Sequence, residues 1–127
     1  MKNTTAAKVA AGLGFLAVAL GAFGAHGLNA TLAAHGTSAI WEKAVLYHLV
    51  HTLMLWLLAG QIPFRRGPWL CFLAGILIFS GSLYVLAATN VRWLGAITPI
   101  GGLSFLAGWF WLMFPPGSPA SSEEVKS

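Results

Sequence analysis

The sequence predicts an all-α integral membrane protein, a four-helix bundle with an interfacial connector between its first two helices. Of the 127 residues, 57% are hydrophobic and 8% are charged, whereas soluble domains carry about 25% charged residues. Four apolar stretches are separated by connections rich in Gly, Pro and charge. Each stretch is long enough to cross a hydrocarbon core of roughly 30 Å. A bilayer lets apolar side chains face outward, so this composition favours a membrane over water.

The first expected span covers about residues 7–25, an Ala- and Gly-rich run that follows Lys2 and Lys8. Such a start also resembles a secretory signal, with cleavage near residues 22–25 as the alternative. A retained helix is the preferred interpretation, because small residues recur along the segment instead of gathering at one point. Gly14 lies on this stripe of small residues, which favours close packing of another helix.

Residues 24–40 form the expected connector, since they are polar and rich in Gly. The second span follows over about residues 43–62 and ends at Pro63. The third span covers about residues 68–89. At its middle, Ser-Gly-Ser predicts a packing notch whose hydroxyls bond to the preceding turn; the three residues are Ser80, Gly81 and Ser82.

The fourth span covers about residues 93–114. Helix-breaking residues interrupt its first half and predict a kink or an unwound entry; they are Thr98, Pro99, Gly101 and Gly102. Residues 1–116 thus form one four-span domain, and residues 117–127 have the composition of a disordered polar tail.

The cations predict the topology. Five of them fall on the side of the two termini and the second connection, and two, Lys43 and Arg92, fall on the other side. The positive-inside rule then places a multi-pass protein in the bacterial inner (plasma) membrane with both termini cytoplasmic. No basic cluster exceeds Arg65-Arg66, so a nucleic acid is not an expected partner. The expected partners are the lipid bilayer and a second copy or another membrane protein.

The second span and the connector hold the candidate polar site. On a helix His48 and His51 lie about 60° apart and Tyr47 about 40° from His51, which predicts one polar face. Glu42 lies about 120° or more from both histidines. Its partner would come from another element or a neighbouring subunit, and the connector offers His26 and His35.

Three interpretations of these histidines stay open: satisfied structural groups, a proton, ion or ligand pathway, and ligation of a metal or haem. His48 and His51 are weak metal candidates, because Glu42 is the only carboxylate nearby. A Ser80 or Ser82 nucleophile is disfavoured, and no catalytic residue or cofactor is expected. Cys71 is the single cysteine, which excludes an intrachain disulfide.

Four motifs in order carry a family resemblance: GAFGAHGL at 21–28, YHLVHTL at 47–53, FSGSLY at 79–84 and LGAITPIGGLSFLAGW at 94–109. Over residues 13–111 the chain resembles the small bacterial inner-membrane protein family of unknown function typified by YgdD and YwdK, which has mitochondrial transmembrane relatives. The resemblance implies a four-helix integral membrane protein with no established reaction.

Three functional hypotheses follow. The first is a non-enzymatic bundle that acts through self-assembly or a partner complex, because small residues recur on three spans. The second is a small transporter or channel component with a Tyr/His polar path beside the broken fourth span. The third is a metal- or haem-binding membrane protein that uses the four imidazoles.

Overall fold

A computed structural model describes residues 2–116 of the chain, and the expected polar tail lies outside the described residues. Within that range the secondary structure is entirely helical, as predicted. The elements in order are α1 (Thr4–Ala25), α2 (Asn29–His35), α3 (Ser38–Ala59), α4 (Arg66–Gly75), the π-helical η1 (Ile76–Ser80), α5 (Gly81–Thr89), the 3-10 helix η2 (Arg92–Ala96) and α6 (Thr98–Leu112).

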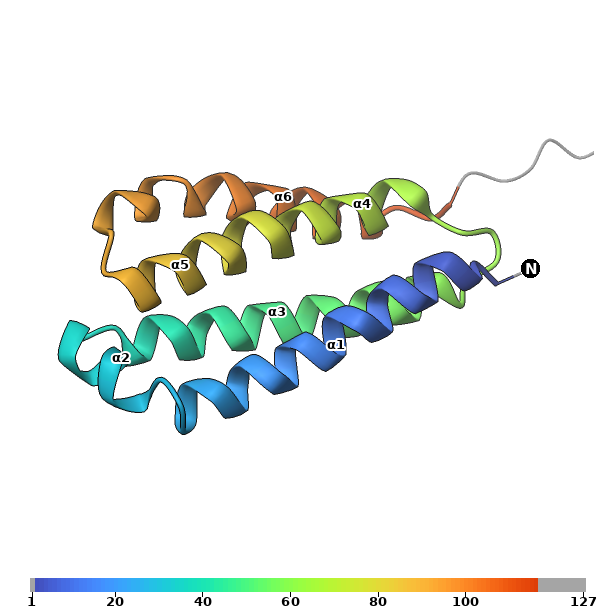
Figure 1. Cartoon of the computed structure of the whole chain (residues 1–127). Helices are drawn as coiled ribbons and strands as arrows, with labels where there is room; N and C mark the ends of the chain where they lie inside the picture. Colours follow the sequence, from blue (N-terminus) through green and yellow to red (C-terminus); the bar gives the residue numbers. More distant parts are fainter. Residues whose placement is uncertain (1, 117–127) are drawn as a thin grey trace, which may run out of the picture.

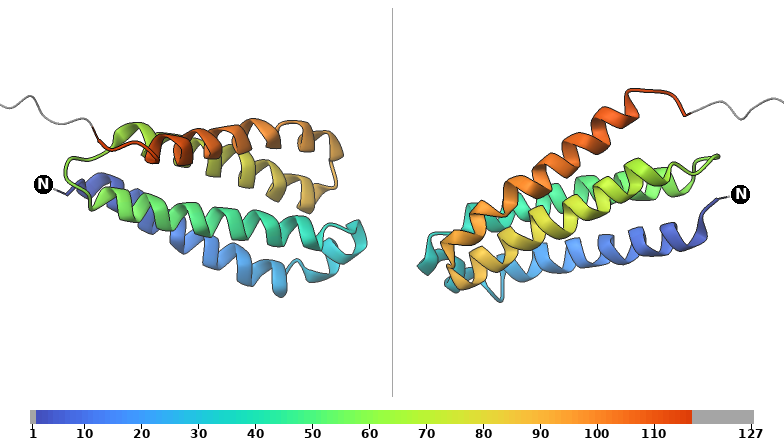
Figure 2. Two further views of the ribbon diagram at one scale, coloured as in Figure 1. Left: turned by 180° about the vertical axis from the view of Figure 1, so that it is seen from behind. Right: turned by 90° about the horizontal axis from the view of Figure 1, so that it is seen from above.

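The helices form two antiparallel pairs. α1 lies along α3, and the continuous rod made of α4, η1 and α5 lies along α6 (Figures 1 and 2). α3 also packs against α4, η1 and α5, whereas the backbones of α1 and α3 do not closely approach that of α6 in the described part of the chain. Side chains alone join α3 to α6. α1 and α6 therefore flank two central rods and leave the ring open, so the expected four-helix bundle is not confirmed.

Three helical segments are long and apolar enough to cross a membrane: Thr4–Ala25, Arg66–Thr89 and Arg92–Leu112. α3 has the same length as α1, 22 residues, but it is not among these three. Its sequence carries Glu42, Lys43, His48 and His51, which lower its hydropathy below that of its neighbours.

Small residues bring the rods close together within the chain. Ala10 and Ala17 of α1 are buried, and a Cβ added at Gly14 would lie 3.6 Å from Cγ2 of Thr52 on α3. At the other pair, a Cβ at Gly101 of α6 would collide with the backbone of Phe79. The small-residue stripe on α1 thus packs inside one molecule, against α3.

The Ser-Gly-Ser segment differs from the expected notch. Ser82 Oγ donates to the carbonyl of Phe79 in the preceding turn (3.0 Å), as predicted, but Ser80 Oγ donates across to the carbonyl of Ala44 on α3 (2.8 Å). The wide π turn of η1 directly precedes α5 and carries Ser80 toward α3. Gly81 would have no neighbour within 4 Å of an added Cβ, so it makes no close helix contact.

The fourth span is interrupted before its proline. The 3-10 helix η2 ends at Ala96, and α6 begins at Thr98 with Pro99 in its first turn. A proline there costs no hydrogen bond, because the first-turn N–H groups have no partner within the helix. Gly101 and Gly102 continue the helix, so the entry is a 3-10 segment and α6 itself is unbroken at these glycines.

Candidate functional site

The six candidate polar residues fall in separate places around α3 and the connector. Tyr47 and His51 line the side of α3 that faces α6. His48 contacts α5, and Glu42 lines a cavity beside α1 and α2. His26 and His35 lie on the connector, away from the two histidines of α3.

His51 has both ring nitrogens in hydrogen bonds. Nδ1 lies 2.7 Å from the carbonyl oxygen of Tyr47, and Nε1 of Trp109 on α6 donates to Nε2 at 3.0 Å. A carbonyl can only accept and an indole N–H can only donate, so His51 is the neutral Nδ1–H tautomer. The ring is buried and stacks on Phe105 with centroids 3.7 Å apart. This imidazole holds α6 against α3 and has no free lone pair for a metal.

A groove runs along the open side between α3 and α6. One cavity, of about 540 Å³, is lined mainly by apolar and aromatic side chains and includes His51, Leu106 and Trp109. A second cavity, of about 410 Å³, shares Tyr47, Phe79 and Pro99 with it. Lys43 lines that second cavity. The groove is therefore hydrocarbon-like along most of its length, with a cation toward the connector end.

His48 points to a different helix. Its Nδ1 lies 2.8 Å from the hydroxyl of Tyr84 on α5. Its Nε2 and the hydroxyl of Thr52, one turn along α3, are buried without a hydrogen-bond partner in the described residues. The expected polar face of Tyr47, His48 and His51 is therefore divided between α5 and α6.

The connector docks on the end of α5. Thr37 Oγ1 and His35 Nδ1 both donate to the carbonyl of Ala87, at 2.8 and 3.1 Å, and Arg92 donates to the carbonyl of His35 at 2.9 Å. The last carbonyls of a helix lack partners within it, so His35 and Thr37 cap α5 from outside. His26 is exposed at the end of α1.

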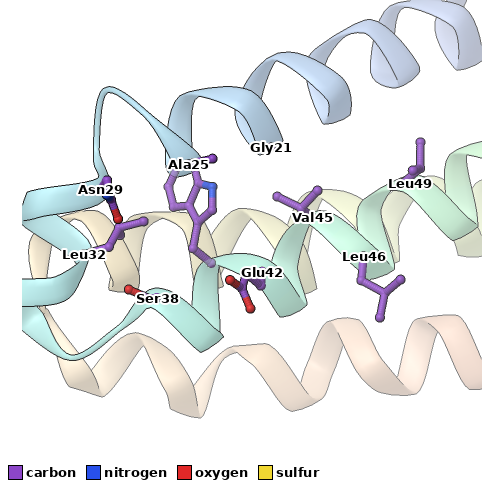
Figure 3. A pocket seen from close by; sticks show the side chains of 11 residues that line it. Gly21, Ala25, Asn29, Leu32, Ser38, Glu42, Val45, Leu46 and Leu49 are labelled. Atoms are coloured by element: carbon purple, nitrogen blue, oxygen red, sulfur yellow. The ribbon is translucent and has the colours of Figure 1, made fainter.

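Glu42 lines a cavity of about 450 Å³ where α1, α2 and α3 meet (Figure 3). Asn29, Ser38 and Glu42 supply the polar part of its wall. Aliphatic side chains and small residues supply most of the rest: Gly21, Gly24, Ala25, Leu32, Val45, Leu46 and Leu49. The cavity lies apart from the groove beside α6, because the two share no lining residue.

The described residues contain no cluster of three or more His, Cys, Asp or Glu side chains that could hold a metal ion. His35 is bonded to α5 and His51 to α6 and its own helix. The geometry therefore does not assemble the four imidazoles on which the metal or haem hypothesis depends.

Sequence reasoning missed two partners of the histidines. Tyr84 belongs to the FSGSLY motif, and Trp109 ends the LGAITPIGGLSFLAGW motif. Trp109 lies in an apolar stretch together with Phe105 and Gly108, and its indole N–H is a group that can only donate a hydrogen bond. A buried histidine on another helix needs such a donor, and this need is the signal that could have linked the two residues.

The chain is similar to several bacterial membrane proteins. It is 50% identical over 103 residues to a UPF0382 membrane protein of Staphylococcus haemolyticus, and the aligned part covers 77% of this chain and 83% of that protein. It is 43% identical over 105 residues to the UPF0382 membrane protein YwdK of Bacillus subtilis, covering 77% and 84%. It is 46% identical over 101 residues to the UPF0382 inner membrane protein YgdD of Escherichia coli, covering 76% of each chain.

No solved structure matches the chain. The model of the family described as protein of unknown function (DUF423) matches residues 20–102. That range contains the Glu42 cavity walls, both buried histidines and Tyr84. The family resemblance predicted from the four motifs is confirmed, and the chain belongs to the DUF423 family.

Proposed function

We propose that this chain is a multi-pass protein of the bacterial inner membrane with four spans and both termini in the cytoplasm. It is non-enzymatic and acts by assembling with a second copy of itself. Three helical segments have the length and composition of spans, and the relatives YwdK and YgdD are named membrane proteins. The excess of cations on the side of the termini supports the orientation.

α3 is the fourth span in this proposal, although its composition alone falls short. It packs along α1 on one side and along α4, η1 and α5 on the other, so it lies at the same depth as two apolar helices. Three of the four ring nitrogens of its histidines have partners within the protein: both nitrogens of His51, on α6 and in its own turn, and Nδ1 of His48, on α5. Polar groups satisfied in this way are compatible with a hydrocarbon surrounding.

Thiol labelling tests the topology. Replacing Cys71, the only cysteine, with alanine gives a cysteine-free chain, into which Ala33→Cys on the connector or Gln61→Cys after α3 is introduced; both positions are exposed. A membrane-impermeant thiol reagent added to spheroplasts should label the cysteine at position 33 and spare that at 61 until the membrane is opened. Labelling of both positions from outside would overturn the four-span arrangement.

The open groove between α3 and α6 is the observation that supports assembly. The small-residue stripe that suggested self-association is used inside the chain, so another surface has to serve. α6 forms one wall of the groove and exposes large apolar side chains along it: Leu103 and Leu106 line the groove, and Phe110 lies one turn further along the helix. A two-fold axis would place the exposed apolar edge of α6 in each copy against the groove of the other, which is the isologous contact that closes a dimer.

A photo-reactive amino acid at Leu106 tests this assembly in reconstituted bilayers. Leu106 lines the groove and is 64% exposed. Val18 on α1, at 66% exposed, is the matched control on another face. Illumination should give an adduct of twice the chain mass from position 106 and only lipid adducts from position 18. Lipid adducts alone from both positions would contradict the proposal.

A further inference from the structure

The cavity at Glu42 has the character of an amphiphile site. Its polar wall lies near the connector, where Asn29 begins α2 and Ser38 begins α3 (Figure 3). Its apolar wall follows α3 away from the connector through Val45 and Leu49. One end therefore suits a head group and the other suits hydrocarbon.

The charge at the polar end is negative. Glu42 is the only acidic residue among residues 1–116, and its exposed side chain lines the cavity. The adjacent Lys43 lines the groove on the α6 side instead. The carboxylate therefore faces the cavity without the cation that is next to it in sequence, and it complements a positively charged ligand group.

The wall behind this carboxylate is fixed by packing. Trp41 is buried, and its Nε1 donates to the carbonyl of Leu20 on α1 at 2.9 Å. Gly24 allows the indole this position, because a Cβ there would collide with the ring. The part of the cavity wall that Trp41 supplies is thus fixed between α1 and α3, and preformed sites bind with a smaller ordering cost.

We propose that this cavity binds an ethanolamine-headed phospholipid of the surrounding membrane. The primary ammonium of the head group donates hydrogen bonds to the Glu42 carboxylate. The side-chain amide of Asn29 and the hydroxyl of Ser38 donate to the phosphate or glycerol oxygens. One acyl chain lies against Val45, Leu46 and Leu49. The inference rests on the membrane placement of α3 proposed above, which sets the connector at the head-group level.

Native mass spectrometry of the purified full-length chain tests the proposal. The protein is offered equal amounts of ethanolamine-, choline- and glycerol-headed phospholipids with identical acyl chains. The ethanolamine lipid should be retained about tenfold better than the other two, since a hydrogen bond to a charged group contributes enough for such a factor. Glu42→Gln should abolish the preference.

Two control variants separate the site from general lipid coating. Lys43→Gln removes a charge at the neighbouring position without touching the cavity and should keep the preference. Leu49→Trp should lower retention of all three lipids by filling the apolar end. Leu53→Trp, one turn further along α3 at a position that lines none of the cavities described, should not.

Equal retention of the three lipids by the wild-type chain, or an unchanged preference in Glu42→Gln, would overturn the proposal. The thiol labelling of positions 33 and 61 is independent of bound lipid. A lost preference with correct labelling therefore counts against this site alone, whereas incorrect labelling counts against the membrane arrangement. Circular dichroism and thermal unfolding of each variant show that it is folded before lipid is added.

Discussion

His51 and Trp109 form the hydrogen bond that joins α3 to α6. Because both imidazole nitrogens are bonded, the ring is fixed in one tautomer and fills a structural position. Trp109→Phe removes the donor and leaves a buried Nε2 without a partner. This should destabilise the protein by about 1–3 kcal/mol, measured as thermal unfolding in one detergent. Trp56→Phe, at an exposed indole on α3, should change stability little.

Thr52 offers a change in the opposite direction. Its hydroxyl is buried without a hydrogen-bond partner in the described residues, and such a group carries a desolvation cost of about 1–3 kcal/mol. Thr52→Val keeps the shape and removes the hydroxyl, so it should raise the unfolding free energy by about 1 kcal/mol. Thr98→Val is the matched control: it removes a hydroxyl that lies 2.6 Å from Ser82 Oγ and should lower stability. A destabilised Thr52→Val would contradict this account.

At this scale the sequence identified which side chains are polar within the spans but not their partners. Helical periodicity placed His48 and His51 about 60° apart, and that difference is enough to direct them to two different helices. Which helices lie there depends on how the rods pack, a property that periodicity within one helix does not contain. The same angle argument separates Glu42 from the histidines, and Glu42 lines a different cavity from His51.

At the scale of elements, the contact between α6 and η1 depends on Gly101. An added Cβ would meet the backbone of Phe79, which cannot move aside as a side chain can. Gly101→Ala should therefore push α6 from the rod and lower stability by about 1–3 kcal/mol. Gly12→Ala on α1, where a Cβ meets nothing within 4 Å, should be neutral or stabilising by up to about 1 kcal/mol. Thermal unfolding of the two variants compares them directly, and equal effects would contradict the close approach.

The helices themselves were largely predictable, because long apolar runs and the Pro- and Gly-rich connections define them in sequence. The π turn at Ile76–Ser80 was not. Two neighbouring residues of this turn contact different helices: Ser80 donates a hydrogen bond to α3, and the backbone of Phe79 packs against Gly101 of α6. The break before α6 was expected at Thr98 to Gly102, but Pro99 fits a first helical turn, so the irregular backbone falls earlier, in η2.

At the scale of the whole molecule, the open arrangement was not predictable from composition. Four apolar segments of similar length are compatible with a closed ring of helices as well as with two joined pairs. Which neighbouring helix the small residues of each segment face distinguishes these two arrangements. Those of α1 face α3, and those of α6 face the α4–η1 rod. The chain therefore builds two pairs joined through its centre, with the aromatic groove left between α3 and α6.

The hydrogen bonds of α3 have a consequence for biosynthesis. Tyr84 and Trp109, the partners of its histidines, follow α3 in the sequence and are synthesised after it. α3 alone is therefore a poor candidate for stable membrane entry. In the cysteine-free background, a chain that carries Gln61→Cys and stops after residue 64 should be labelled from outside at position 61, whereas the full chain should not. Replacing His48 and His51 with leucine should restore protection to the short chain. The last helices to be synthesised would thus determine where an earlier one comes to rest.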